Sequence, residues 1–475
     1  MGRDGPCGRQ AVTGDVRKSA VARALRHSRV VVGLAAATAA GLGPARAAGP
    51  SAPPGWDIRF GHRLRGATVD APFRAEAAPG TRDGALSLRT RLAAEARPGP
   101  LWLGAELMDS RVYGIRNRGP RSTSLVNALA ILQAYGGVQA PLGEATISGR
   151  LGRFTMDLGS RRLVARNRFR NTINNFFGFE GRLSGAEGLD LRVFATLPVR
   201  RQPSEPEAIG ANRIELDRED FDRVFWGIFA RKELSRLDLR VEGWVFGLHE
   251  AEGLGDRDLM TVGSRIVFPR GPGRLDGELE GSVQLGTSPA ASPSAPRLDH
   301  LAFFVHGTVG YTFATWAEPR CGVSVDVASG DADPDDGSNN RFDTLFGARR
   351  FEFGPTGIYG ALARSNLASV EGRCSMRPAP GLEGIVAVRP AFLASATDTW
   401  VTAPLRDSTG EAGSRIGTQV EGRLRWRPEP SPIGFDLGFA VLERGRFVRT
   451  LQPDRKGPIT AVYLQSTLRL SAAGG

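Results

Sequence analysis

The sequence lacks any run of eighteen apolar residues beyond its N-terminal region. A transmembrane helix needs about 20 mostly apolar residues, so a helical membrane protein is not expected. The chain is also poor in histidine and cysteine, with five and three residues respectively. The histidines beyond the N-terminal region have no metal-ligand spacing, and no G-x-S-x-G nucleophile motif occurs. We therefore predict no enzyme, no metal site and no cofactor.

The first 47 residues have the pattern of a signal peptide. A basic segment precedes an apolar stretch at Val30–Leu42, and Ala45-Arg46-Ala47 offers a cleavage site of small residues. A transmembrane anchor is the alternative interpretation, but the apolar stretch is too short for one. We predict a signal peptide over 1–47 and an exported mature chain over 48–475.

The chain carries a formal net charge of +12, of which the predicted signal peptide contributes +6. The mature chain therefore stays basic, which in many soluble proteins suggests a nucleic-acid ligand. No nucleic-acid-binding motif is present, and the chain is expected to be exported. An anionic substrate and lipopolysaccharide are the predicted partners, and nucleic acid is not.

Beyond residue 50, short segments of alternating apolar and polar residues are joined by connectors that are short and long in turn. The short connectors contain glycine and proline, as at Pro98-Gly99-Pro100, and the long ones are polar, as at 202–221. This pattern is typical of a transmembrane β-barrel with short periplasmic turns and long extracellular loops. An even number of strands places both ends of the barrel in the periplasm. The eighteen predicted strands lie near 56–70, 85–97, 101–114, 124–140, 145–159, 176–186, 190–201, 222–232, 237–249, 261–270, 274–287, 300–316, 321–330, 366–378, 383–395, 415–428, 433–448 and 459–470.

Period-two alternation assigns one face of each strand to lipid and the other to the lumen. In the strand near 300–316, Leu301 and Phe303 share one face, while His306 and Thr308 share the other. Other strands carry several charges on one face, and these must line a wet lumen because lipid cannot solvate them. A soluble sandwich also alternates, but the signal peptide and the connectors favour a barrel. We predict an all-β fold, a transmembrane antiparallel β-barrel in the outer membrane of a Gram-negative bacterium.

Two cysteines lie beyond the predicted signal peptide, Cys321 and Cys374. Both fall near the periplasmic ends of strands that one long extracellular loop connects, and both share a strand face with apolar residues. They are therefore candidates for a cross-strand disulfide on the lipid face. Whether they are bridged depends on the strand register, which the sequence leaves open.

The most distinctive stretch is Leu158–Glu180, which reads LGSRRLVARNRFRNTINNFFGFE. It resembles the alginate-export family of outer-membrane barrels, whose members carry a glycine-arginine strand end and then an Arg/Asn-rich run into the next strand. The resemblance implies a channel for passive export of an anionic exopolysaccharide such as alginate, with periplasmic secretion partners. The matching positions are Gly159, Arg161, Leu163, Arg166, Asn167, Phe169, Arg170, Asn171, Asn174, Phe176 and Gly178.

Five arginines lie within ten residues of this stretch, from Arg161 to Arg170. A guanidinium keeps its charge and presents a planar fork that matches a carboxylate. A series of such groups lowers the electrostatic barrier for a polyuronate and lets each sugar move between sites. Asparagine side chains can bind the sugar hydroxyls. The predicted substrate-binding residues of the lumen are Arg161, Arg162, Arg166, Arg168, Arg170, Asn171, Asn174, Arg192, Arg373, Arg389, Arg423 and Arg425.

Each lumen arginine also has an alternative role as a structural ion pair, because porin lumens hold arginine rows opposite carboxylate rows. Some arginines of 161–170 could instead bind lipopolysaccharide phosphates at the outer rim. A general or substrate-specific porin for small anions or sugars is the alternative function, and a plugged structural barrel is a third. The carboxylates available for ion pairs include Asp276, Glu278, Glu280, Asp326, Glu371 and Glu421.

Two predicted extracellular segments allow two interpretations each. Asp331–Asn340 has the acidic spacing of a calcium loop, but glycine is missing at the sixth position and no glutamate closes the loop. A solvated acidic loop is therefore favoured there. Phe342–Tyr359 contains five aromatic residues among arginine and glycine. It could fold into the lumen as a constriction or cap the barrel outside.

Overall fold

The structure is a computed structural model, and the residues that it describes lie within Ala45–Gly475. The predicted signal peptide lies outside the described residues. In this described part, no helix combines the length and the apolar character needed to cross a membrane. The described ranges are 55–74, 81–115, 121–290, 296–333 and 335–474.

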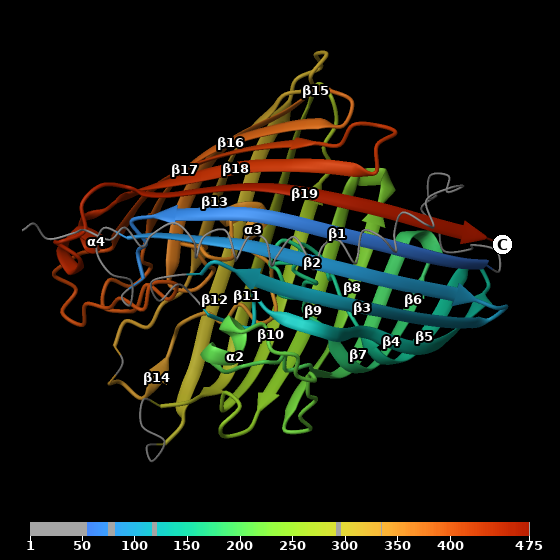
Figure 1. Cartoon of the computed structure of the whole chain (residues 1–475). Helices are drawn as coiled ribbons and strands as arrows, with labels where there is room; N and C mark the ends of the chain where they lie inside the picture. Colours follow the sequence, from blue (N-terminus) through green and yellow to red (C-terminus); the bar gives the residue numbers. More distant parts are fainter. Residues whose placement is uncertain (1–54, 75–80, 116–120, 291–295, 334, 475) are drawn as a thin grey trace, which may run out of the picture. The chain divides into compact units, whose positions relative to one another are not determined.

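Eighteen strands form one closed antiparallel sheet, in which β19 pairs with β1 to complete the ring (Figure 1). The predicted barrel and its eighteen strands are thus confirmed. A short additional strand, β14, pairs in parallel with β12. The strands are β1 (Gly55–Asp70), β2 (Arg82–Arg97), β3 (Leu101–Tyr113), β4 (Asn127–Leu142), β5 (Ala145–Phe154), β6 (Phe176–Ser184), β7 (Leu189–Pro198), β8 (Arg223–Leu234), β9 (Leu239–Glu250), β10 (Arg257–Phe268), β11 (Arg274–Ser288), β12 (Leu298–Thr312), β13 (Arg320–Ala328), β14 (Ser338–Asn339), β15 (Leu367–Ala379), β16 (Leu382–Phe392), β17 (Arg415–Trp426), β18 (Ile433–Arg444) and β19 (Ile459–Gly474).

The connectors alternate in length as predicted, so the short turns all lie at one end of the barrel. The start of β1 and the end of β19 lie at this same end. In outer-membrane barrels this is the periplasmic end. The long loops at the other end contain the short α-helices. These elements are η1 (Ala186–Gly188) and η2 (Ser235–Leu237) in the short turns, and α2 (Pro206–Gly210), α3 (Arg350–Phe353) and α4 (Arg446–Leu451) in the long loops.

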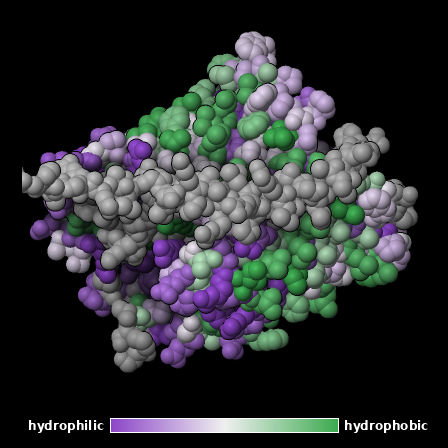
Figure 2. Space-filling view, viewed as in Figure 1, coloured by the Kyte–Doolittle hydropathy of each residue, from purple (hydrophilic) through white to green (hydrophobic). Residues whose placement is uncertain are grey.

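Alternate side chains of each strand face outward and inward. In β12, Leu301 and Phe303 are 58% and 47% exposed, while Phe304 and His306 are buried. Figure 2 shows hydrophobic residues gathered over the strands and hydrophilic residues over the loops near α4. An apolar outer belt with polar residues inside is the arrangement that a barrel needs in lipid.

Two long loops enter the barrel and meet inside it. The first lumen loop (155–175) bonds to β3, where the Ser110 hydroxyl donates to the Asn171 carbonyl at 2.8 Å. It also bonds to β11, where the Ser160 hydroxyl donates to Glu280 at 3.0 Å. Because β3 and β11 lie on opposite sides of the ring, this loop crosses the lumen. It explains why β5 ends at Phe154 and not near residue 159 as predicted.

The second lumen loop (340–366) runs beside the first one. The backbone N–H of Phe346 donates to the Leu163 carbonyl at 2.9 Å, and Ala165 donates back to Phe346 at 3.2 Å. The Tyr359 hydroxyl reaches the wall and donates to Gln419 of β17 at 2.7 Å. The aromatic segment Phe342–Tyr359 therefore folds into the lumen, which decides between the two interpretations left open by the sequence.

The register places Cys321 of β13 directly opposite Cys374 of β15. Their Cα atoms are 4.1 Å apart and their sulfurs form a disulfide. The bridge links the two strands that flank the second lumen loop, close to the periplasmic end.

Candidate functional site

Wall arginines that the sequence did not single out hold the first lumen loop. Arg63 of β1 donates to the carbonyls of residues 168 and 169 at 3.1 Å and of residue 170 at 3.0 Å. Arg89 of β2 donates to the carbonyls of residues 170 and 168 at 2.9 and 3.0 Å. These guanidiniums satisfy carbonyls that a buried loop would otherwise leave unpaired. The wall therefore fixes the first lumen loop through its main chain.

The two predicted asparagines have structural contacts. The Asn171 amide nitrogen lies within 2.7–3.2 Å of the carbonyls of Leu88, Arg111 and Leu125, which fixes the loop against the wall. The Asn174 amide donates to Ala165 and Phe346, both at 2.9 Å, and so joins the two lumen loops.

A buried ion cluster fixes the other side of both loops. Arg162 of the first lumen loop lies 2.5 Å from both Glu278 of β11 and Glu352 of α3, and it also contacts Glu280. His306 lies between these groups, with Nδ1 at 2.8 Å from Asp326 and Nε2 at 3.2 Å from Glu278. The cluster therefore ties both lumen loops to the wall formed by β11, β12 and β13.

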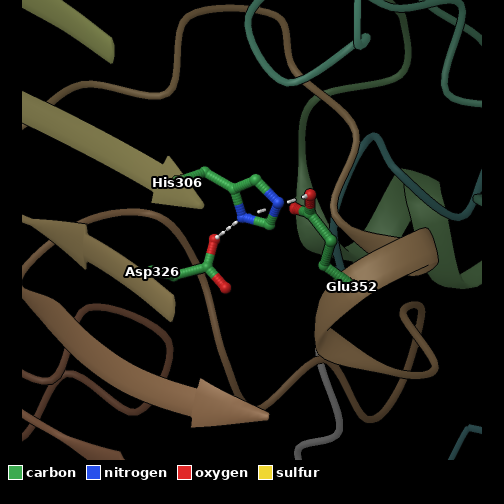
Figure 3. Close-up of side chains that lie close together, drawn as sticks. All are labelled: His306, Asp326 and Glu352. Carbon is green, nitrogen blue, oxygen red and sulfur yellow. Dashed lines mark hydrogen bonds and ion pairs between the residues drawn. The ribbon is translucent and has the colours of Figure 1, made fainter. Parts of the chain in front are cut away.

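His306, Asp326 and Glu352 present ligand atoms that lie within 4.8 Å of one another. Figure 3 shows the His306 ring between the two carboxylates. Guanidiniums already bind the two carboxylates, since Arg389 lies 2.8 Å from Asp326 and Arg364 contacts Glu352. A metal ion would have to compete with these fixed cations for the same oxygens. The arrangement is an ion-pair network.

Most of the predicted lumen arginines are paired with carboxylates. The wall arginines among them lie on different strands and do not converge on one site. In the described part of the chain, no ion pair joins Arg161 or Arg170 to a carboxylate. Arg161 instead lies over the Phe351 ring, 5.2 Å from its centroid. The paired residues and their partners are Arg162 with Glu278, Glu280 and Glu352; Arg166 with Glu106; Arg168 with Asp157; Arg192 with Asp190; Arg373 with Glu371 and Glu421; Arg389 with Asp326 and Glu371; Arg423 with Asp436; and Arg425 with Glu383.

A cavity of about 460 Å³ lies between the lumen loops and the segment after β7. We call it the loop cavity. Of the predicted residues, it brings together Arg170 and Asn174, and it adds Arg201 and Arg349. Asn174 orients two of these arginines, because its amide oxygen accepts from Arg170 at 2.8 Å and from Arg201 at 2.9 Å. The lining residues are Thr123, Asn167, Arg170, Asn174, Asn175, Pro198, Val199, Arg200, Arg201, Gln202, Ser204, Arg223, Thr344, Leu345, Phe346, Gly347, Arg349, Thr356, Ala363 and Arg364.

The positive charge of the loop cavity is only partly neutralised. Among the described residues, no ion pair joins Arg170, Arg201 or Arg349 to a carboxylate. Burial, and then the charges of Arg201 and Arg349, lower the pKa of Arg170 to about 9. Burial, and then the charges of Arg74 and Arg364, lower the pKa of Arg349 to about 10. A bound anion would reduce this mutual repulsion.

Arg201 and Arg349 were missed by sequence reasoning, because an isolated Arg-Arg pair, formed with Arg200 or with Arg350, does not by itself indicate an anion site. No local pattern marks them, and the first lumen loop brings them to Arg170 only through contacts distant in sequence. The basic run at 161–170 was the one available signal for this region.

Comparison with known proteins gives a family and a fold. The family model described as alginate export matches residues 56–461. Pseudomonas aeruginosa OpdK with vanillate is similar at TM-score 0.57 and 13% identity, covering 88% of this chain and 99% of that one. Pseudomonas aeruginosa OccK8 (OprE) is similar at TM-score 0.56 and 12% identity, covering 88% of this chain and 98% of that one. At these identities the likeness shows the fold alone. No curated protein matches the chain by sequence.

Proposed function

The chain belongs to the alginate-export family and is a channel of the Gram-negative outer membrane, and on that premise we propose that it exports an anionic exopolysaccharide such as alginate. Transport is passive, down the gradient of the polymer. The family and the fold are those of channels, which are not enzymes. Contact with lipopolysaccharide and with periplasmic secretion partners stays a prediction.

The observation that carries the proposal is the convergence of Arg170, Arg201 and Arg349 on the loop cavity. Most other lumen arginines already have carboxylate partners, so their charge is largely balanced inside the wall. The three unpaired guanidiniums are available to the carboxylates of a uronic-acid polymer, which they would bind in the forked geometry of Arg–carboxylate pairs. Several such donors around one cavity allow a carboxylate to exchange between them, as conduction requires.

The alternative is a porin for small carboxylates. Two observations support it: the loop cavity has the volume of a small-molecule site, and the similar barrel OpdK has been crystallised with vanillate, an aromatic carboxylate. Under this alternative the same three arginines would bind a single small anion.

Single-channel recording in planar bilayers tests the proposal. We expect an anion-selective current that alginate oligomers block and neutral dextrans of equal length do not. Arg170→Gln should weaken the block, because it removes one of the three unpaired charges. Arg168→Gln is the matched control, since this residue lies in the same loop, is 67% exposed and pairs with Asp157. If monomeric uronate or vanillate blocks the current and the alginate oligomers do not, the result would support the small-anion porin.

A further inference from the structure

The periplasmic rim of the lumen carries a second basic cavity. It measures about 500 Å³ and lies where the turn 313–319, the turn between β15 and β16, and the end of β17 meet. Its lining includes Trp316, Arg377, Arg425 and Arg427, against one carboxylate, Glu383, among the described residues. We call it the rim cavity.

Backbone hydrogen bonds between neighbouring turns shape the rim cavity. The N–H of Arg377 donates to the Ala317 carbonyl at 2.8 Å, and the N–H of Arg427 donates to the Gly381 carbonyl at 2.8 Å. Gly381 has φ +71°, and a Cβ there would lie 2.0 Å from the Arg427 carbonyl oxygen. Only glycine at position 381 therefore allows the turn to lie so close to Arg427. The cavity is held by main-chain contacts and is formed before a ligand arrives.

The rim cavity has excess positive charge. In the described part of the chain, no ion pair engages Arg427, and Arg377 lies 3.8 Å from an exposed glutamate, Glu318. Arg425 does have a close partner, because it lies 2.8 Å from Glu383. A smaller adjoining cavity of about 170 Å³ shares Arg377 and Glu383 with it and adds Arg270, Arg320 and Glu318. Arg425 and Glu383 stand on the lumen faces of their strands, so the rim cavity borders the lumen.

Trp316 gives the rim cavity an open aromatic surface, because it is 82% exposed beside these arginines. A tryptophan at a membrane interface often serves as an anchor. Here the indole instead borders guanidiniums at the rim of a polysaccharide channel. A pyranose ring presents apolar C–H groups that pack on an aromatic face, while a uronate carboxylate binds guanidinium forks. One sugar residue of a polyuronate carries both features.

We propose that the rim cavity is a capture site for uronic-acid residues of the polymer, where Trp316 packs against the sugar ring and Arg377 and Arg427 bind its carboxylate. The proposal rests on the proposed function and adds a second binding site, separate from the loop cavity. A charged cleft at the mouth of a channel raises the local concentration of an oppositely charged ligand and its association rate. The rim cavity thus loads polymer that arrives from the periplasm.

Sided block of single channels tests this proposal. Alginate oligomers are added to one chamber at a time, and the on-rate and duration of blocking events are measured separately. Biotin attached to a Ser235→Cys variant on the short β8–β9 turn, with streptavidin in one chamber, identifies the periplasmic side. The test variants are Trp316→Ala and the pair Arg377→Gln with Arg427→Gln. Arg236→Gln is the matched control, because it removes one charge from another short turn.

In both test variants we expect the on-rate from the periplasmic side to fall about three- to tenfold. This is a small part of the increase in association rate that charged clefts provide, which is about 10- to 1,000-fold. The on-rate from the extracellular side and the duration of block should stay unchanged, as should both rates in Arg236→Gln. Unchanged on-rates in the Arg377/Arg427 variant, or equal losses from both sides, would overturn the rim site alone. Absence of block from both sides in the unmodified protein would refute the export function and the rim site with it.

Discussion

Replacing Arg162 with alanine tests whether the buried ion cluster holds the lumen loops in place. The Arg162 side chain is 4% exposed and contacts Glu278, Glu280 and Glu352. Removing one partner of a buried ion pair costs about 3–5 kcal/mol, because the remaining charges are left buried and unpaired. Taking about 4 kcal/mol, docking of the two loops should weaken about a thousandfold, since each 1.4 kcal/mol changes an equilibrium constant tenfold. The barrel should persist, since its main-chain pairing does not depend on Arg162.

Limited trypsin digestion of the protein in liposomes measures this docking, since released loops expose arginines such as Arg349 and Arg364. We expect Arg162→Ala to be cut within 340–366 far faster than the unmodified protein, and its conductance to become noisy. Arg168→Ala is the control, because its exposed pair with Asp157 at 3.3 Å should contribute less than about 1 kcal/mol. Equal digestion and equal conductance in the two variants would refute the reasoning.

Three other predictions follow from the same structure. Gly347→Ala should separate the lumen loops and raise conductance in single-channel recordings, because an added Cβ would lie 1.7 Å from the Arg162 carbonyl oxygen. Unchanged conductance would contradict the close approach of Gly347 to Arg162. Cys374→Ser should lower the temperature at which the folded barrel is lost on semi-native gels, because the disulfide to Cys321 closes a loop of 53 residues. Closing a loop of this length stabilises the folded state by at most about 4 kcal/mol. An unchanged transition under non-reducing conditions would show that the bridge adds no stability. Raising KCl from about 0.1 to 1 M should weaken alginate block, because the Debye length falls from about 10 to 3 Å; salt-independent block would argue against an electrostatic site.

The barrel could be predicted because its signals are local. Alternation along each strand and the chemistry of each turn are set by neighbouring residues, so the strand near 56–70 is found at Gly55–Asp70. Boundaries failed where a distant contact intervened. β5 ends early because the first lumen loop turns inward, and β19 continues to Gly474 because it pairs with β1 as far as Trp56.

The site could be predicted only in part, because its residues meet through contacts between distant segments. Arg162 and Arg170 belong to the same basic run, yet one enters a carboxylate cluster and the other lines the loop cavity. What separates them is the position of β11 and α3, which no local pattern encodes. Arg201 and Arg349 join Arg170 for the same reason. The carboxylates that the sequence offered as ion-pair partners include two of the three that bind Arg162, and they include the partners of Arg373 and Arg389. The third partner of Arg162, Glu352, was not among them.

Release of entrapped polymer from proteoliposomes tests the central claim most directly. Vesicles containing the protein are loaded with fluorescent alginate oligomers or with neutral dextrans of equal length, and efflux is followed after removal of external label. We predict that alginate escapes and dextran is retained, and that a variant carrying Arg170→Gln and Arg201→Gln releases alginate more slowly. Retention of alginate by vesicles that release monomeric uronate would contradict polymer export and establish a porin for small anions.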